Sequence, residues 1–276
     1  MENPYRDLPI KGNIKPVITL TGIIFLLTLF ASLTGVLASK DTYPTRELYA
    51  TFVANDFANL FIGLPVLLGS LIAMRQGSLI GLLCLPGGWL YILYNYLVYS
   101  LSMQPKNIYP VYPILVLLCI AAFVTYLRIL SSKSIKLFLE GSVSTRLVGG
   151  FLINLGSLFF LRAASVIITA GVNHSGLLRT ELALNIADLV ITPLWIIIGM
   201  LLWKHHPLGF GLGLTVLFQA NSLFLGLILF LLLQPVLSSS TINITDLTVI
   251  ILMAFVALLP FVLFITGIHK RKNRTL

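Results

Sequence analysis

The sequence contains eight long, continuous apolar segments, and this feature limits the possible folds more than any other. The segments cover residues 17–38, 52–74, 79–101, 112–130, 147–170, 182–203, 208–233 and 247–268. Each segment has 19 or more residues, and a helix of about 20 residues crosses the hydrocarbon core of a bilayer. The runs are continuous rather than alternating, which excludes a transmembrane β-barrel. The sequence therefore predicts an all-α, polytopic helical bundle with eight transmembrane helices.

The composition excludes an ordinary soluble protein. Of the 276 residues, 58% are hydrophobic and 10% are charged, whereas soluble domains are about 45–50% apolar and about 25% charged. Because the connections are short, we expect a single membrane domain over residues 1–276, with its longest connection at 131–145. This connection mixes apolar and basic residues, which predicts a short amphipathic helix on the membrane surface.

The distribution of positive charge predicts the orientation of the chain. The net charge is +9, from 18 Lys and Arg against 9 Asp and Glu. With eight spans, thirteen basic residues lie on the side of both termini, four lie on the other side, and Arg162 lies within a span. Short cytoplasmic loops of membrane proteins carry an excess of Lys and Arg. The sequence therefore predicts a multi-pass protein of the cell membrane with both termini in the cytoplasm.

The first apolar segment has a second interpretation. The residues Val36-Leu37-Ala38 follow a basic tail and a long apolar run, and they resemble the cleavage site of a signal peptide. Cleavage would leave seven spans. The apolar run is longer than a usual signal core, which favours a retained span.

Tyrosines gather near the expected outer ends of the third and fourth spans. An aromatic belt at the membrane interface has this pattern. We therefore expect an interfacial position for Tyr94, Tyr96, Tyr99, Tyr109 and Tyr112.

Two stretches of the sequence resemble each other. Residues 56–65 align with residues 185–193 when one gap is allowed, and both stretches end in a proline. The first stretch carries a D-x-x-N pair and the second carries an N-x-x-D pair. These pairs are Asp56 with Asn59 and Asn185 with Asp188.

The spans that follow these stretches also begin alike, with Gly-x-x-x-Gly at positions 77 and 81 and at positions 209 and 213. This spacing lets helix backbones approach closely. The two patterns predict two parallel four-helix repeats, residues 1–130 and 146–276, joined by the cytoplasmic connection 131–145. The alternative is chance, since apolar segments resemble each other by composition.

Three ionisable residues lie inside the predicted spans. An ionised side chain in a bilayer costs roughly 2.5–3.5 kcal/mol on insertion scales. Arg162 and Asp188 lie at similar depths below the outer side, which predicts an ion pair between the fifth and sixth spans. Asp56 lies four residues into the second predicted span, so we expect it nearer the interface. Two interpretations fit these residues: an ion pair that fixes helix packing, or a cavity that binds a polar or charged ligand.

Several amide side chains lie in the same spans and could complete such a cavity, although amides also form hydrogen bonds between helices that serve packing alone. The candidate ligand- or ion-binding residues are Asp56, Asn59, Asn95, Arg162, Asn185, Asp188, Gln219 and Asn221. The last span has almost no polar residue, so we expect it to face lipid. Prolines near mid-span, at positions 65, 86 and 193, predict either packing kinks or the broken helices that line transport sites.

No motif for a nucleotide, a metal or another cofactor is present, and nothing indicates a nucleic-acid partner. The leading prediction is a small-solute or ion- or proton-coupled transporter, or a ligand-binding membrane protein, with an outward-facing polar cavity. One alternative is a structural subunit of a membrane complex. A second is a membrane-embedded enzyme acting on lipid, for which no nucleophile, base or metal set is recognisable. The expected partners are the lipid bilayer and a small molecule or ion, and no protein partner is identified.

Overall fold

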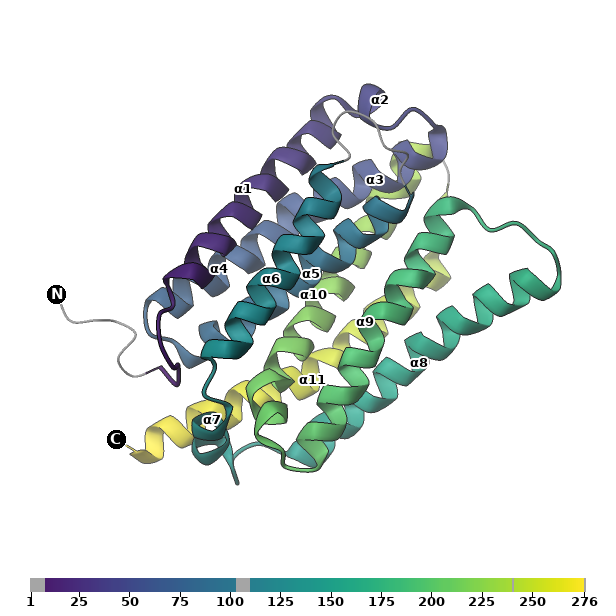
Figure 1. The fold of residues 1–276 in the computed structure, drawn as a ribbon. Coiled ribbons are helices and arrows are strands. Elements are labelled where there is room, and N and C mark those ends of the chain that lie inside the picture. The colour runs from purple at the N-terminus through teal and green to yellow at the C-terminus, as the bar shows by residue number, and fades with distance from the viewer. Residues whose placement is uncertain (1–7, 103–109, 240, 276) are drawn as a thin grey trace.

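The computed structural model describes residues 8–102, 110–239 and 241–275, and nearly all of them are helical (Figure 1). The first half contains α1 (Lys15–Leu37), α2 (Ser39–Thr42), α3 (Arg46–Ala58), the π-helical turn η1 (Asn59–Gly63), α4 (Leu64–Arg75), α5 (Leu79–Ser102) and α6 (Val111–Ile129). The second half contains α7 (Ser132–Leu139), α8 (Thr145–Val172), α9 (Arg179–Trp203), α10 (Pro207–Ser238) and α11 (Ile244–Thr275).

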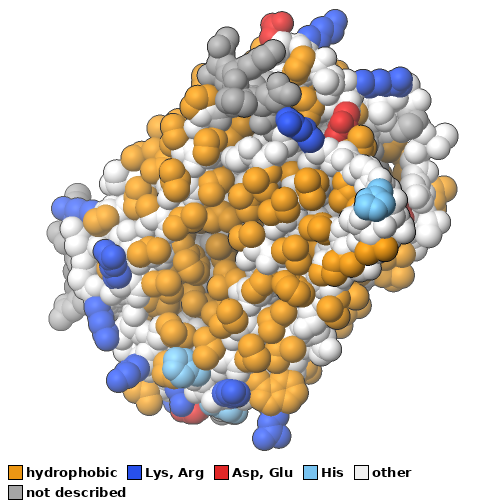
Figure 2. Space-filling view, turned by 45° about the vertical axis from the view of Figure 1, so that its right-hand side comes forward, with side chains coloured by type: hydrophobic (Ala, Val, Ile, Leu, Met, Phe, Trp, Pro, Cys, Tyr) orange, Lys and Arg blue, Asp and Glu red, His pale blue; other side chains and the backbone are white. Residues whose placement is uncertain are grey.

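Within the described residues, eight helices are long and apolar enough to cross a membrane, and α3, η1 and α4 together form one of them. No β-strand occurs there beyond an isolated bridge between Ile10 and Leu130. The predicted all-α polytopic bundle is confirmed. Figure 2 shows a broad apolar belt between two ends at which Lys and Arg side chains gather.

The two ends of the bundle are named here by the termini. Helix α1 begins and α11 ends at one end, which we call the terminal end (Figure 1). The opposite end, where α1 ends and α11 begins, is the distal end. Most basic residues of the described chain lie at the terminal end, as the charge distribution predicted.

Helix α5 is the centre of the bundle. It packs against α4, α6, α9 and α10 and is buried on all sides, whereas α1, α8 and α11 lie at the periphery. The ring nitrogen of Trp89 donates a hydrogen bond to Thr21 Oγ1 at 3.1 Å, which ties α1 to α5. Removal of α1 as a signal peptide would therefore break a buried hydrogen bond of the central helix. The peripheral position of α11 agrees with the expectation that the last span faces lipid.

Pro86 shows how the interior of α5 satisfies its backbone. Proline has no N–H, so the carbonyl of Leu82 lacks its helical donor. The hydroxyl of Tyr126 on α6 donates to that carbonyl at 3.2 Å. The neighbouring carbonyl of Leu83 accepts from Thr215 Oγ1 on α10 at 2.6 Å. The turn interrupted by Pro86 therefore receives hydrogen bonds from two neighbouring helices. Irregular backbone inside a membrane protein persists only where such groups satisfy it.

The second span begins earlier than predicted, at Arg46 rather than at position 52. Thr45 caps this helix, because its side chain accepts a hydrogen bond from the Leu48 N–H at 3.2 Å. The cap brings a polar first turn into the helix that hydropathy alone does not recognise. Asp56 consequently lies about three turns inside the span and not near its beginning.

The connection at 131–145 contains the predicted amphipathic helix, α7, but not in the predicted position. Its apolar residues Ile135 and Leu139 are buried, and the helix packs against α10 and α11. Of the apolar residues of α7, only Leu137 is strongly exposed, at 71%. The apolar face of α7 is therefore covered mainly by protein rather than by the membrane surface.

The expected aromatic belt is also wrong for most of its members. Tyr96, Tyr99 and Tyr112 are buried inside the bundle, and Tyr94 is bonded to a buried carboxylate. The rings of the three buried tyrosines pack against one another, with centroid distances of 5.0 to 5.6 Å. Tyr109 lies outside the described residues. Phenol groups with partners inside the protein do not need the interface for their hydroxyls.

The turns after α4 and α9 have the same construction. Gly77 and His205 adopt left-handed backbone conformations, with φ of 79° and 54°. The next residue in each turn donates its N–H back to the preceding helix, from Ser78 to Ala73 and from His206 to Leu201. Gly81 and Gly209 each occupy the third position of the helix that follows. Gly81 and Gly209 therefore occupy equivalent positions relative to their turns, whereas the Gly-x-x-x-Gly pairs would align Gly81 with Gly213.

These two glycines permit a contact between backbones. A Cβ added at Gly81 would lie 2.4 Å from the Met74 nitrogen, and one added at Gly209 would lie 2.3 Å from the Leu202 nitrogen. At Gly69, by contrast, nothing lies within 4 Å of an added Cβ.

We expect Gly81→Ala and Gly209→Ala each to lower the free energy of unfolding by about 1–3 kcal/mol, because a backbone contact must open. Gly69→Ala is the matched control and should stabilise slightly, by about 0.5–1 kcal/mol, through helix propensity. Unfolding of the purified protein in detergent measures all three. Equal stability of the three variants would contradict the close packing.

Candidate functional site

Two buried carboxylates form the polar centres of the bundle, and both lie in its distal half. The Asp188 cluster comprises Tyr94, Arg162, Asn185, Asp188 and Thr192. The Asp56 cluster comprises Ser32, Tyr43, Asp56, Tyr96 and Tyr99. Helix α5 contributes tyrosines to both clusters.

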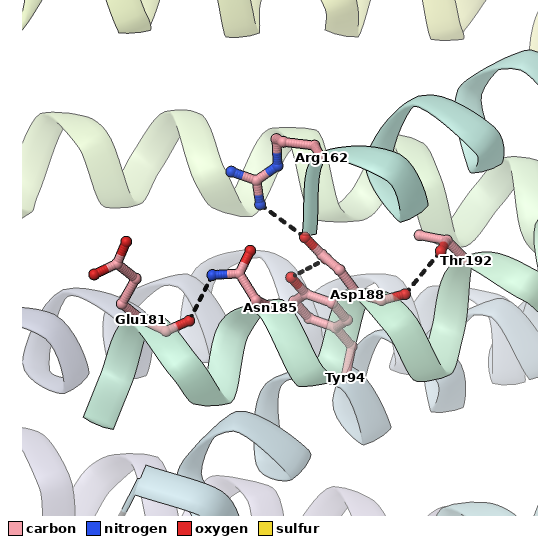
Figure 3. Close-up of polar contacts among 6 residues, drawn as sticks. All are labelled: Tyr94, Arg162, Glu181, Asn185, Asp188 and Thr192. Carbon is pink, nitrogen blue, oxygen red and sulfur yellow. Dashed lines mark hydrogen bonds and ion pairs between the residues drawn. The ribbon is translucent and has the colours of Figure 1, made fainter. Parts of the chain in front are cut away.

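The Asp188 cluster contains the predicted ion pair (Figure 3). Arg162 Nη2 on α8 lies 2.8 Å from Asp188 Oδ2 on α9. The other carboxylate oxygen accepts from the hydroxyl of Tyr94 on α5 at 2.8 Å. The carboxylate therefore has one charged and one neutral donor from different helices. Sequence reasoning missed Tyr94, because it assigned this residue to the membrane interface.

The two partners of the ion pair differ in exposure. The side chain of Asp188 is 8% exposed, whereas that of Arg162 is 48% exposed. Arg162 lies about 15 Å from the distal end of α8 at 1.5 Å per residue. Its guanidinium also lies over the ring of Phe159, with 5.9 Å between Cζ and the ring centroid. A guanidinium has five N–H donors, and in the part of the chain described Asp188 is the only acceptor of Arg162. Arg162 thus presents unused donors at the surface of the bundle, well inside the apolar belt.

Polar residues form a stripe along α9 beneath Arg162. Glu181, Asn185, Asp188 and Thr192 follow one another at steps of four, three and four residues, which places them on one helix face. Asn185 Nδ2 donates to the Glu181 carbonyl, and Thr192 Oγ1 donates to the Asp188 carbonyl, both at 2.8 Å. Asn185 Oδ1 is buried and has no hydrogen-bond partner among the described residues. The stripe runs from the distal end of α9 to its middle.

The distal ends of three helices are tied together near this stripe. Glu47 Oε1 on α3 accepts from Thr180 Oγ1 at 2.5 Å, in the first turn of α9. Its neighbour Arg46 donates from Nη2 to the Ser238 carbonyl at 2.9 Å, at the end of α10. Glu47 Oε1 also accepts from the Thr180 N–H at 3.4 Å. Glu47 and Arg46 thus supply partners to backbone groups at helix ends, which lack intrahelical ones.

The Asp56 cluster holds its carboxylate with phenols. Asp56 Oδ2 accepts from the Tyr43 hydroxyl at 2.5 Å, and Oδ1 accepts from the Tyr99 hydroxyl at 2.8 Å. Ser32 and Tyr96 share a hydrogen bond of 3.0 Å beside them. Asp56 is 1% exposed. The expectation that Asp56 lies near the interface is therefore wrong, because the helix begins earlier and α1 covers its face.

The approach of α1 to this carboxylate depends on Gly35. An added Cβ at Gly35 would clash with Asp56 Oδ2. No ion pair to Asp56 occurs among the described residues. The ion pairs found there are Arg162–Asp188 and Lys136–Glu140.

The remaining candidate residues do not join either carboxylate directly. Gln219 bridges helices, because its Oε1 accepts from the Trp195 ring nitrogen and its Nε2 donates to the Leu90 carbonyl. Asn221 donates to the Ala257 carbonyl on α11 at 3.2 Å. Asn95 donates to the carbonyl of Tyr91 in its own helix. Asn59 is fully buried in η1. Gln219 and Asn221 thus make interhelical contacts of the packing kind.

A hollow of about 400 Å³ lies at the terminal end, between α8 and α9. It is lined by Gly150, Ile153, Asn154, Met200, Trp203 and Lys204. It is therefore separate from both carboxylate clusters, which lie in the distal half.

Comparison with known proteins gives no further guide: no protein-family model, no curated protein and no solved structure matches this chain.

We expect Arg162→Met to lower the free energy of unfolding by about 3–5 kcal/mol, because it leaves the Asp188 carboxylate buried without its cation. Adding Asp188→Asn should recover most of that loss. Arg128→Met is the control, since Arg128 is exposed at the end of α6. A cost for Arg162→Met no larger than that of the control would show that the pair does not stabilise the fold.

Proposed function

We propose that this protein is a membrane transporter for a small polar or charged solute, and that Arg162 and the polar stripe of α9 form its binding site. The observation that carries the proposal is the half-exposed side chain of Arg162, which lies within the apolar belt. Lipid offers no acceptors for its remaining N–H groups, and ionisable residues inside spans commonly mark substrate or ion pathways. A solute with an anionic or hydrogen-bond-accepting group would satisfy them.

The stripe of α9 supports a route to this site. Glu181 and Asn185 lie between the distal end and the Arg162–Asp188 pair, and the unpartnered Asn185 Oδ1 offers an acceptor. A solute entering from the distal end would meet polar groups until it reached Arg162. The ion pair would then open or re-pair as the solute binds, which changes the contact between α8 and α9.

We further propose that the two halves of the chain are parallel repeats. The separation along the sequence between Asn59 and Asp188 is one residue longer than that between Pro65 and Pro193. Gly81 and Gly209 have the same separation as the two prolines. The π-helical turn η1 lies between Ala58 and Leu64, where the extra residue of the first half must be accommodated. A π turn holds one residue more than the α-helical turn it replaces.

The packing of the helices also supports this repeat. The span formed by α3, η1 and α4 corresponds to α9, and α5 corresponds to α10. In this correspondence α3 packs on α10 as α9 packs on α5. An added Cβ at Gly87 would lie 2.5 Å from the Thr215 carbonyl oxygen. These two positions have the same sequence separation as Pro65 and Pro193, so the contact falls where a two-fold axis would pass. Transport sites of repeat-built carriers lie at such repeat interfaces.

For orientation, we propose a cell-membrane location with the terminal end in the cytoplasm. The excess of Lys and Arg at that end supports this. The stripe of α9 would then open to the outside of the cell.

A structural role in a membrane complex is the second candidate, and it rests on the same guanidinium. Helix α8 packs mainly on α9, which leaves much of its surface uncovered. A carboxylate on a partner helix could pair with Arg162 in place of a solute.

Thiol labelling distinguishes these functions. With the buried Cys84 and Cys119 replaced, we expect Asn185→Cys to react with a membrane-impermeant reagent added outside intact cells, because transport through the proposed site requires water to reach the stripe. Asn185 is 2% exposed, so this reaction reports opening of the contact between α8 and α9. Leu184→Cys is the matched control, at the same depth but facing away from the stripe, and should not react.

Glu181→Cys, at the entrance, should react fastest. Reaction only from the opposite side would contradict the orientation. Failure of Asn185→Cys to react from either side, in a folded protein, would exclude an aqueous site and favour the structural role.

A further inference from the structure

The negative charge of an ionised Asp56 is not balanced by a cationic side chain among the described residues. Its carboxyl group is 1% exposed, and the described residues that bond it are neutral phenols. The titratable side chains gathered around it are Tyr43, Tyr96, Tyr99 and Tyr112, and α1 contributes Ser32 and Gly35. An isolated carboxylate buried in this way is strongly unfavourable. A positive species must therefore neutralise it.

Asn59, one turn further along the same span, is a second and independent observation, because its amide is buried without hydrogen-bond partners in the described part of the chain. Its side chain is 0% exposed, and both of its amide atoms, Oδ1 and Nδ2, are buried without a hydrogen-bond partner among the described residues. Orphaned polar groups of this kind are uncommon in native proteins, and each suggests an unseen water or ion. The spacing of three residues places Asn59 on the same face of the helix as Asp56.

The backbone next to Asn59 adds a further oxygen. Asn59 begins the π turn η1, and its carbonyl accepts from the Leu64 N–H. Pro65 follows directly and has no N–H, so it cannot donate to the Phe61 or Leu60 carbonyl. One carbonyl of this turn therefore lacks its helical donor. Opened helices inside membrane proteins use such carbonyls to coordinate small cations.

The available ligands are all hard oxygens: a carboxylate, an amide oxygen, a carbonyl and two phenols. Hard cations prefer oxygen ligands, and a single carboxylate balances a single positive charge. We propose that Asp56 and Asn59, with the carbonyl freed at η1, bind one small monovalent cation, either a sodium ion or a proton.

The hydrogen bonds of Tyr99 accommodate either occupant. The Tyr99 hydroxyl lies 2.8 Å from Asp56 Oδ1 and 3.2 Å from the Phe52 carbonyl oxygen. It can donate to the carboxylate when a metal ion supplies the charge. When Asp56 carries the proton, the carboxyl can donate to Tyr99 while Tyr99 donates to Phe52.

The two clusters then differ in one respect. Asp188 is neutralised by Arg162, a cation fixed to α8, whereas Asp56 is neutralised by one that can exchange. The cation is thereby assigned as the coupling ion of the transporter, and only that assignment rests on the proposed function. Binding of the cation does not depend on it.

The test uses the full-length protein purified in detergent at constant ionic strength. Replacing choline chloride by sodium chloride should raise Tm of the wild-type protein, by on the order of 5 °C at a hundredfold excess over Kd. Asp56→Asn should abolish this rise, and Asn59→Leu should increase the sodium concentration at its midpoint at least tenfold. Asp246→Asn removes an exposed carboxylate on α11 and should leave the rise unchanged.

If the occupant is a proton, Tm is insensitive to sodium, and infrared spectra of the wild-type protein contain a protonated-carboxyl band. Asp56→Asn should remove this band, and both Tyr99→Phe and Asn59→Leu should shift it. The last two variants keep the assignment testable if Asp56→Asn does not fold.

The proposal is overturned if sodium leaves Tm unchanged and no protonated-carboxyl band responds to these variants. A response to sodium or a proton that is lost in Asp56→Asn but kept in Asn59→Leu would remove Asn59 from the site. Cation binding together with unreactive Asn185→Cys would contradict only the proposed transport function.

Discussion

Hydrogen bonds from the tyrosines of α5 to two buried carboxylates are the interaction on which the arrangement of this bundle depends. Tyr94 donates to Asp188 on α9, and Tyr99 donates to Asp56 on α3. The central helix is thereby fixed to one helix of each half of the chain. A bilayer supplies no water to replace these donors, so rotation of α5 would expose both carboxylates to an apolar surrounding. The register of the central helix is therefore set by polar contacts, while its burial is set by apolar ones.

The two carboxylates share a donor type and differ in their source of positive charge. Asp188 receives a guanidinium from α8. Among the described residues, Asp56 accepts from the neutral hydroxyls of Tyr43 and Tyr99, while α1 passes close by at Gly35. An arginine in the first half would require room that this close approach denies. The different packing of α1 and α8 thus gives the two carboxylates different partners. Asp188 is neutralised by Arg162, whereas neutralising Asp56 requires a cation that is not part of the chain.

The sequence alone determined the spans, because the hydrophobicity of a segment is a local property. All eight predicted spans occur, and the fifth and sixth carry the predicted pair of Arg162 and Asp188 at matching depths. Depth follows from counting residues along a helix of known rise, so the pairing could be predicted without a structure. The second span was placed less well, because its first turn is polar and is formed through the Thr45 cap rather than through hydrophobicity.

Only the tertiary structure decided which faces meet. The donor role of Tyr94, the burial of Asp56 and the docking of α7 on α10 all depend on how helices rotate and tilt against one another. An apolar segment gives little information on these angles, since most of its faces are equally apolar. The same limit explains why tyrosines at a predicted interface belong to the core. It also explains why the exposure of Arg162, on which the proposed function rests, becomes visible only once α8 is placed at the edge of the bundle.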